Sequence, residues 1–197
     1  MLPEALQRRQ NDLEMTPKPI VPPEQLSEET RELFDLLNHE ADLAVIRIAT
    51  SFLDACLKSI LENHFLEGNT SERMLGHSGI LGALSARSDL CYVLGLISKG
   101  WYNDLRKFAE IRNTVAHHHL QLSFDDEDIA KQCNELSTIE LIGMGPEQMT
   151  PRTRFTLCVA MLANWLLITA LQIKQKLKVT SPRDPRLIRY TTSPPPE

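Results

Sequence analysis

The sequence is short of the residues and patterns that define most catalytic and exported proteins. It has eight glycines in 197 residues, and its four cysteines, Cys56, Cys91, Cys133 and Cys158, form no C-x-x-C pair and have no histidine at zinc-finger spacing. We therefore expect them to be buried small hydrophobic residues in a reducing compartment. The first fifteen residues contain no apolar run typical of a signal peptide, so the sequence predicts a cytoplasmic protein.

Strand patterns are also missing, because no segment alternates apolar and polar residues as a half-buried strand does. The Gly76-x-x-Gly79-x-x-Gly82 repeat follows no strand and has the wrong spacing for a nucleotide loop. No Ser-His-Asp order and no isolated pair of acids is present, and we expect no cofactor. The sequence predicts an all-α protein, a single bundle of about five or six helices. A Pro-rich N-terminal arm (1–25) precedes a helical domain (26–180), and a disordered or extended basic and Pro-rich tail (181–197) is predicted to follow it.

Apolar residues at helical spacing place the helices within this domain. The first helical stretch begins after Ser27 and runs on to Leu61, either as one long helix or as two in tandem with a joint near Asn38 and His39. Glu67–Glu72 is a loop by composition. Further helices are predicted over residues 76–97, 99–118, 123–136 (with Ser123 or Asp125 as the N-cap) and 150–177 (with Thr150 as the N-cap), and a loop over residues 143–146.

The last of these helices contains 19 uncharged residues, from 155 to 173, which is about the length needed to cross a membrane. It also contains Asn164, Thr169 and Gln172, and a helix covered on all sides by others has the same composition. We therefore predict a buried central helix and no membrane contact.

Charge is unevenly distributed along the chain, whose formal net charge is −5. Residues 148–193 contain eight Lys and Arg residues and one acid, a net +7, whereas the rest has 13 basic and 25 acidic residues, a net −12. A basic segment of this kind suits phosphate or the acidic surface of a partner. The predicted nucleic-acid-binding residues are Lys174, Lys176, Lys178, Arg183, Arg186 and Arg189.

The helix over residues 99–118 ends in the most polar stretch of the domain. On a helical wheel Asn113 and His117 lie opposite the apolar face, while Arg112 lies on the side of that face. We predict that Arg112 points towards the bundle, and that Asn113 and His117 point outwards and can touch. His117, His118 and His119 diverge by about 100° from one to the next along a helix, so no metal site is expected.

Two sequence blocks resemble the mannitol operon repressor (MltR-like) family. They are Gly79–Ile97 and the spaced pair Tyr102-Asn-Asp-Leu105 and Ile111-Arg-Asn-Thr-Val-Ala-His117. The resemblance implies an all-helical cytoplasmic protein that exerts negative control over genes for mannitol uptake and use. No helix-turn-helix with a basic recognition helix is evident. The implied repressor acts either through DNA contact by an unusual surface or through a protein partner.

The shorter motif Arg112-Asn113-x-x-x-His117 is similar to that of the HEPN superfamily, which includes metal-independent ribonucleases. This resemblance implies a cleft shared by two subunits, with Arg112 holding phosphate charge, His117 as acid or base and Asn113 orienting the site. Our first interpretation is a homodimeric transcriptional regulator that is not an enzyme. The alternative is a HEPN-type endoribonuclease or RNA-binding toxin component, with RNA in place of DNA as the partner.

Overall fold

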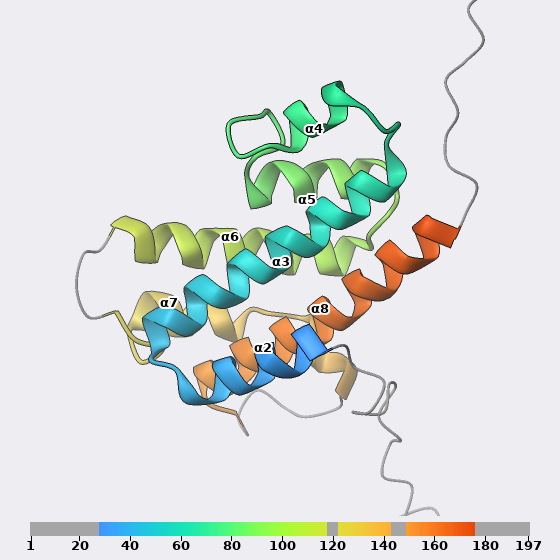
Figure 1. Ribbon diagram of the computed structural model, residues 1–197. Coiled ribbons are helices and arrows are strands. Elements are labelled where there is room, and N and C mark those ends of the chain that lie inside the picture. The colour runs from blue at the N-terminus through green and yellow to red at the C-terminus, as the bar shows by residue number, and fades with distance from the viewer. Residues whose placement is uncertain (1–27, 118–121, 143–148, 176–197) are drawn as a thin grey trace, which may run out of the picture.

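A computed structural model describes residues 28–117, 122–142 and 149–175, and within these residues every regular element is a helix, with no strand. The all-α prediction is confirmed. The seven α-helices and one 3₁₀ helix exceed the five or six helices predicted (Figure 1). They are α2 (Glu28–His39), α3 (Asp42–His64), α4 (Asn69–Leu75), α5 (Leu84–Val93), α6 (Lys99–His117), α7 (Glu127–Asn134), η2 (Thr138–Ile142) and α8 (Pro151–Gln175).

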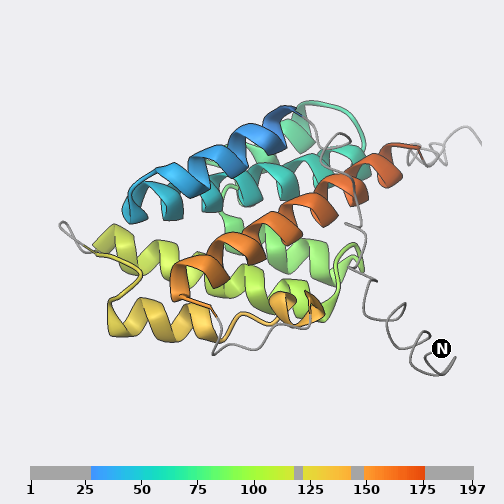
Figure 2. The same ribbon diagram turned by 90° about the horizontal axis from the view of Figure 1, so that it is seen from below.

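Two long helices, α3 and α8, form the centre of the fold. α3 packs against α8, α5, α6, α2 and α4, while α8 packs against α3, α7, α2 and η2. Figure 2 shows α8 running diagonally between the α2–α3 pair and the α6–α7 pair. α8 is long and apolar enough to cross a membrane, yet side chains along it, from Phe155 to Ile173, are buried against the other helices. The buried-helix prediction for this segment agrees with the structure.

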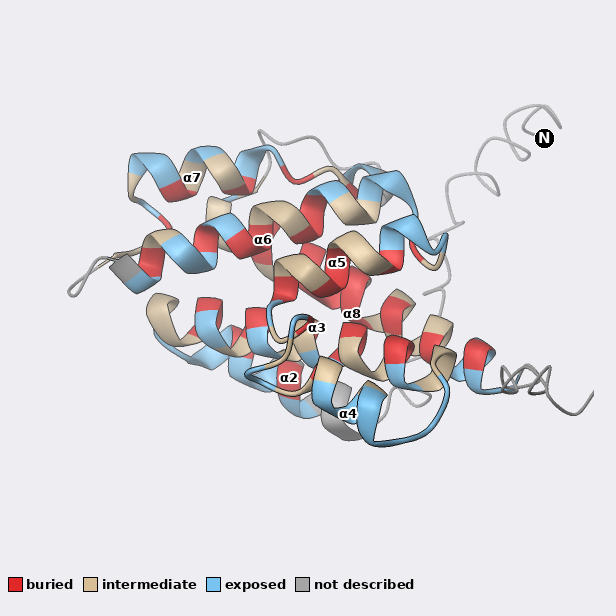
Figure 3. Ribbon diagram, turned by 90° about the horizontal axis from the view of Figure 1, so that it is seen from above, coloured by how far each residue is buried: buried red, intermediate tan, exposed pale blue. Residues whose placement is uncertain are grey.

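The helix pair at the N-terminal side follows the predicted pattern. α2 ends at His39 and α3 begins at Asp42, so the predicted joint is confirmed. On α3 the buried stripe recurs at helical spacing and includes Ile46, Leu53 and Leu57, none of which is exposed. Figure 3 shows these buried stripes on the inner faces of the helices. The four cysteines are buried, as predicted, and form no disulfide with one another.

The segment around α4 and α5 differs from the prediction. Residues 69–75 form α4 where a loop was expected, and residues 76–83 form turns where a helix was expected. Three glycines explain the turns, because the chain folds back on the end of α4. A Cβ at Gly79 would lie 2.3 Å from the carbonyl oxygens of Arg73 and Met74, and one at Gly82 would lie 2.2 Å from the His77 oxygen. Small residues were expected here because they let another backbone come close. They do so in the structure, but the backbone that comes close belongs to the same turn and not to another helix.

The later helices match the predicted positions with shifted ends. α6 runs from Lys99 to His117, and α7 begins at Glu127, after the predicted cap residues. α8 begins at Pro151, and the Thr153 backbone N–H donates to Thr150 Oγ1 at 3.1 Å, which confirms the predicted N-cap. The arm over residues 1–25, His118 and His119, the 143–146 loop and the tail over residues 181–197 lie outside the described residues.

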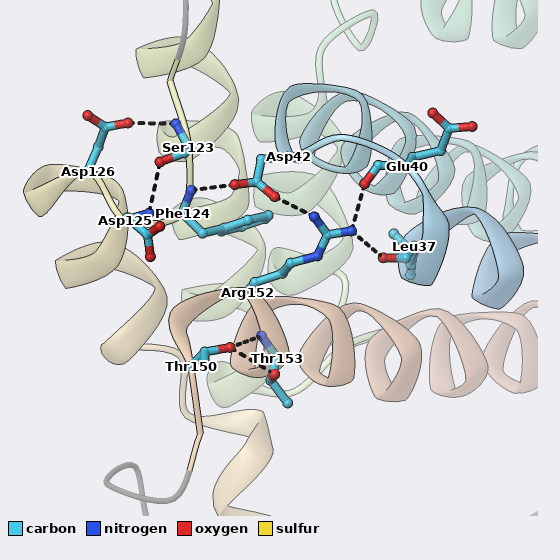
Figure 4. A network of polar contacts seen from close by, with 10 residues as sticks. All are labelled: Leu37, Glu40, Asp42, Ser123, Phe124, Asp125, Asp126, Thr150, Arg152 and Thr153. Atoms are coloured by element: carbon cyan, nitrogen blue, oxygen red, sulfur yellow. Dashed lines mark hydrogen bonds and ion pairs between the residues drawn. The ribbon is translucent and has the colours of Figure 1, made fainter.

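One polar network ties distant segments of the chain together at one corner of the bundle (Figure 4). Asp42, at the start of α3, accepts a hydrogen bond from the Phe124 backbone N–H at 3.0 Å and pairs with Arg152 in the first turn of α8. Arg152 also donates to the carbonyl oxygens of Glu40 (2.7 Å) and Leu37 (3.2 Å). Segments more than 80 residues apart in sequence are therefore held at one corner, which fixes the start of α8 against α2 and α3.

Candidate functional site

The C-terminal half of α6 carries the predicted site residues. Asn113 is exposed, as the helical wheel predicted. His117 is the last residue of α6, and its side chain lies outside the described part of the structure. Arg112 is also exposed, so the prediction that it points into the bundle is wrong. The inner face of α6 is filled by apolar side chains instead: Leu105, Phe108, Ile111 and Val115 are at most 2% exposed.

Arg112 lines an open groove between α3 and α6. This cavity has a volume of about 300 Å³ and is lined by Arg47 and Ser51 from α3 and by Arg112, Val115 and Ala116 from α6. Each helix contributes residues four positions apart, which lie on one face of a helix. The structure therefore places Arg112 on the same groove as a second guanidinium group, that of Arg47, which the sequence interpretation did not single out.

A second cavity adjoins this groove on the other side of α3. It has a volume of about 540 Å³, lies between α2 and α3, and shares Arg47 and Ser51 with the first. Its remaining lining is mainly apolar and includes Leu36, Ile48 and Phe52, together with one acid, Glu32. Arg47 and Ser51 thus stand between a cationic groove and an apolar one.

Charge in the groove is unbalanced within the described part of the chain. Neither Arg47 nor Arg112 forms an ion pair there, whereas Arg87 pairs with Asp54 at 2.5 Å and Arg106 pairs with Asp89 at 3.6 Å. A sequence signal for Arg47 does exist: it is the one charged residue between Asp42 and Asp54, in an otherwise uncharged stretch of α3.

The opposite half of α6 has a structural polar residue, Asp104. This side chain is 1% exposed and accepts hydrogen bonds from the Ser137 backbone N–H (2.9 Å), Ser137 Oγ (3.1 Å) and the Thr138 backbone N–H (2.7 Å). Cys158 Sγ lies 3.6 Å from the same carboxylate. Asp104 thus satisfies the free N–H groups at the start of η2 and joins α6 to α8. It is not part of the Arg112 groove.

Tyr102, in the same sequence block, is half-buried and packs against the hydrophobic core. Its hydroxyl donates to Asp89 Oδ1 at 3.0 Å, and its ring stacks on Tyr92 with centroids 4.6 Å apart. The hydrogen bond to Asp89 and the negative charge of that carboxylate raise the pKa of Tyr102. These contacts hold α5 against α6, so Tyr102 has a structural role.

The basic C-terminal region is used partly for structure. Arg154 is 3% exposed and donates to the Leu136 carbonyl oxygen at 2.7 Å, and Arg152 belongs to the corner network. Lys174 is exposed in the last turn of α8. The other predicted nucleic-acid-binding residues lie outside the described residues: Lys176, Lys178, Arg183, Arg186 and Arg189. Among the described side chains, no group of His, Cys, Asp and Glu is arranged to hold a metal ion.

Fold and site together define an all-helical regulatory or binding domain, because the described residues assemble an open cationic groove and a set of structural polar contacts. The sequence matches the family model described as mannitol repressor over residues 31–178, which is most of the chain. The chain therefore belongs to the mannitol repressor family. It is by class a negative regulator of transcription, which confirms the first of the two sequence resemblances.

Two solved structures share the fold. The X-ray structure of the MtlR-HPr complex from Escherichia coli contains a chain that is 20% identical, with a TM-score of 0.56, covering 70% of this chain and 98% of that one. A possible transcriptional regulator, YggD, from Shigella flexneri 2a str. 2457T is 16% identical, with a TM-score of 0.57, covering 72% and 99%. A search of the curated proteins gives no significant match. At these identities the two structures establish the shared fold.

Proposed function

We propose that this chain represses genes for mannitol uptake and use by binding a protein partner, and that it does not read DNA with a helix of the domain. The observation that carries this proposal is how the described cations are used. Arg106, Lys107 and Arg152 pair with acids, and Arg154 is buried. The unpaired Arg47 and Arg112 lie on two different helices, so no described helix presents a row of unpaired Lys and Arg. DNA-reading helices need such side chains for phosphate and base contacts.

The relative solved as the MtlR-HPr complex supports a protein partner. We propose HPr of the same organism as the partner of this chain, and a homodimer as its own assembly. The predicted basic residues from Lys174 to Arg189 support the remaining route, direct DNA contact by the C-terminal segment.

The test compares the two routes with purified components. Calorimetric titration of the full chain with HPr is expected to give saturable binding, and the chain alone is expected to leave mannitol operator DNA unshifted at physiological salt. The full chain and a chain lacking residues 176–197 should bind HPr alike. A shift by the chain alone that weakens steeply with salt and disappears on that deletion would establish direct DNA contact instead.

The ribonuclease alternative depends on Arg112, Asn113 and His117. Arg112 and Asn113 are both exposed on α6, and this exposure favours a cleft shared with a second subunit. If the chain is a ribonuclease, the pure protein should cleave RNA in the presence of a metal chelator. The Arg112→Ala and His117→Ala variants should have lost this activity. Arg106→Ala, on the same helix but paired with Asp89, is the matched control. Intact RNA with all four proteins rejects this function.

A further inference from the structure

We propose that the groove between α3 and α6 binds the phosphate group of a small organic phosphate monoester, with Arg47, Arg112 and Ser51 as the donors. The first reason is charge. Two guanidinium groups line one small cavity and have no acid partner among the described residues. Two like charges on one groove create a positive potential that attracts an anion, and no described acid forms an ion pair that would cancel it.

Donor geometry favours phosphate over a single carboxylate. Arg47 and Ser51 are four residues apart on α3 and approach the groove from one side, and Arg112 approaches from α6 on the other. Each guanidinium group presents parallel N–H donors that match two oxygens of a phosphate, and a hydroxyl supplies a further donor. A tetrahedral anion offers oxygens to both walls of the groove, whereas one guanidinium group already satisfies a planar carboxylate.

The adjoining cavity indicates what the phosphate is attached to. The space between α2 and α3 opens on the same two residues, Arg47 and Ser51, and is lined by Leu36, Ile48 and Phe52. Leu36 is 40% exposed, so an apolar surface is accessible there. Cavities of about 300 and 540 Å³ are within the range that binds small molecules. The organic substituent of the ester would therefore lie over Leu36 and Phe52.

Glu32 limits where the phosphate can lie. It lines the apolar cavity together with Arg47 but does not line the groove that contains Arg112. A carboxylate repels a phosphate group, so the phosphate is expected on the α6 side of Arg47 and the substituent on the α2 side. This arrangement is independent of the proposed partner binding, and each can fail without the other.

The experiment titrates the full chain with phenyl phosphate and with inorganic phosphate. Calorimetry measures the affinity for each, and changes in amide chemical shifts show which residues respond. We expect the ester to bind more tightly than inorganic phosphate. Arg47→Gln and Arg112→Gln should each weaken both ligands by roughly tenfold, because each removes charge-assisted hydrogen bonds. Leu36→Ala should weaken the ester and leave inorganic phosphate unchanged.

Two controls make the result decisive. Arg106→Gln removes the same charge from α6 outside the groove and should leave both affinities unchanged. Glu32→Gln should retain binding or strengthen it. Equal affinity of the wild type for the ester and for inorganic phosphate would overturn the monoester assignment. No saturable binding up to about 10 mM, or equal weakening by Arg106→Gln, would overturn the site itself.

Discussion

At the scale of single residues, Asp104 shows how one buried carboxylate organises a junction. Three donor groups of Ser137 and Thr138 donate hydrogen bonds to it, and Cys158, which is fully buried, lies close to the same carboxylate. We predict that Asp104→Asn lowers the free energy of unfolding by about 3 kcal/mol, because an amide nitrogen would face N–H donors and the charge-assisted bonds would be lost. Urea unfolding followed by circular dichroism measures the change.

Asp89→Asn is the matched control for that prediction. Asp89 accepts one hydrogen bond from Tyr102, but its side chain is 50% exposed. A loss below about 1 kcal/mol is expected there. Equal losses of unfolding free energy for the two substitutions would show that the burial of Asp104 adds nothing to its contribution to stability.

The buried thiols make a second prediction at this scale. Burial raises the pKa of Cys91 and of Cys133 to about 12, and it also raises the pKa of Cys158, with the Asp104 carboxylate adding to the effect. Each thiol is neutral at pH 8, and the thiolate is the nucleophile. Native chain at pH 8 should therefore resist alkylation by iodoacetamide at these residues, as mass spectrometry of peptides would show.

The same pKa shifts set the sign of the alkaline response. The pKa of Cys91 and of Cys133 is higher in the folded chain than in the unfolded chain. The contribution of these neutral thiols to folding stability is therefore fully present below about pH 9 and is lost as the pH rises from 9 towards 12. Chain unfolded in urea should alkylate readily at pH 8 and serves as the control. Fast labelling of native Cys133 at pH 8 contradicts the prediction.

Residue-scale features were the least accessible to sequence reasoning. The wheel placed Asn113 correctly because its angle is far from the apolar stripe. It misplaced Arg112, whose angle is near the edge of that stripe. There the outcome depends on how closely α3 approaches α6, and a groove remains between them. Asp104 was noted only as an acid beside the motif, since its partners lie about 33 residues away in sequence.

At the scale of elements, the turn between α4 and α5 depends on glycine. We predict that Gly79→Ala destabilises the fold by about 3 kcal/mol or more, because the added methyl group would meet two backbone oxygens at 2.3 Å, which cannot move aside as a side chain can. Gly100→Ala, in the first turn of α6 with nothing within 4 Å, should be neutral or slightly stabilising. Thermal unfolding of the two variants measures the contrast, and a tolerated Gly79→Ala would refute the close-packed turn.

Element positions follow the sequence where the local signals agree. Thr150 and Pro151 start α8, and the joint at His39 separates α2 from α3, because cap residues and apolar periodicity coincide there. The turn over residues 76–83 was predicted as helix because spaced small residues suit close helix packing as well as a tight turn. Only the backbone oxygens of Arg73 and Met74, brought near by the fold, distinguish the two.

At the scale of the whole molecule, the bundle is closed by contacts between distant segments. The corner network joins α2, α3, the segment before α7 and α8 through Asp42 and Arg152 (Figure 4). Sequence periodicity predicts which face of each helix is buried but not which helices meet. The all-α class was therefore predictable, while the groove between α3 and α6 was not, because it depends on how these two helices, which are not consecutive in the chain, pack.

The exposure of side chains on α8 differs between its centre and its end. Ala163 is fully buried at the centre of α8, whereas Leu171, near its end, is 59% exposed. In a bundle, Ala163→Arg places an unpaired charge in the core and should prevent folding, whereas Leu171→Arg should shift the melting temperature by no more than a few degrees. The wild-type chain and Leu171→Arg should both remain in the supernatant after high-speed centrifugation without detergent. Recovery of the wild-type chain only by detergent extraction of membranes would contradict this, because α3, α7 and α2 pack against α8 and bury much of its apolar surface.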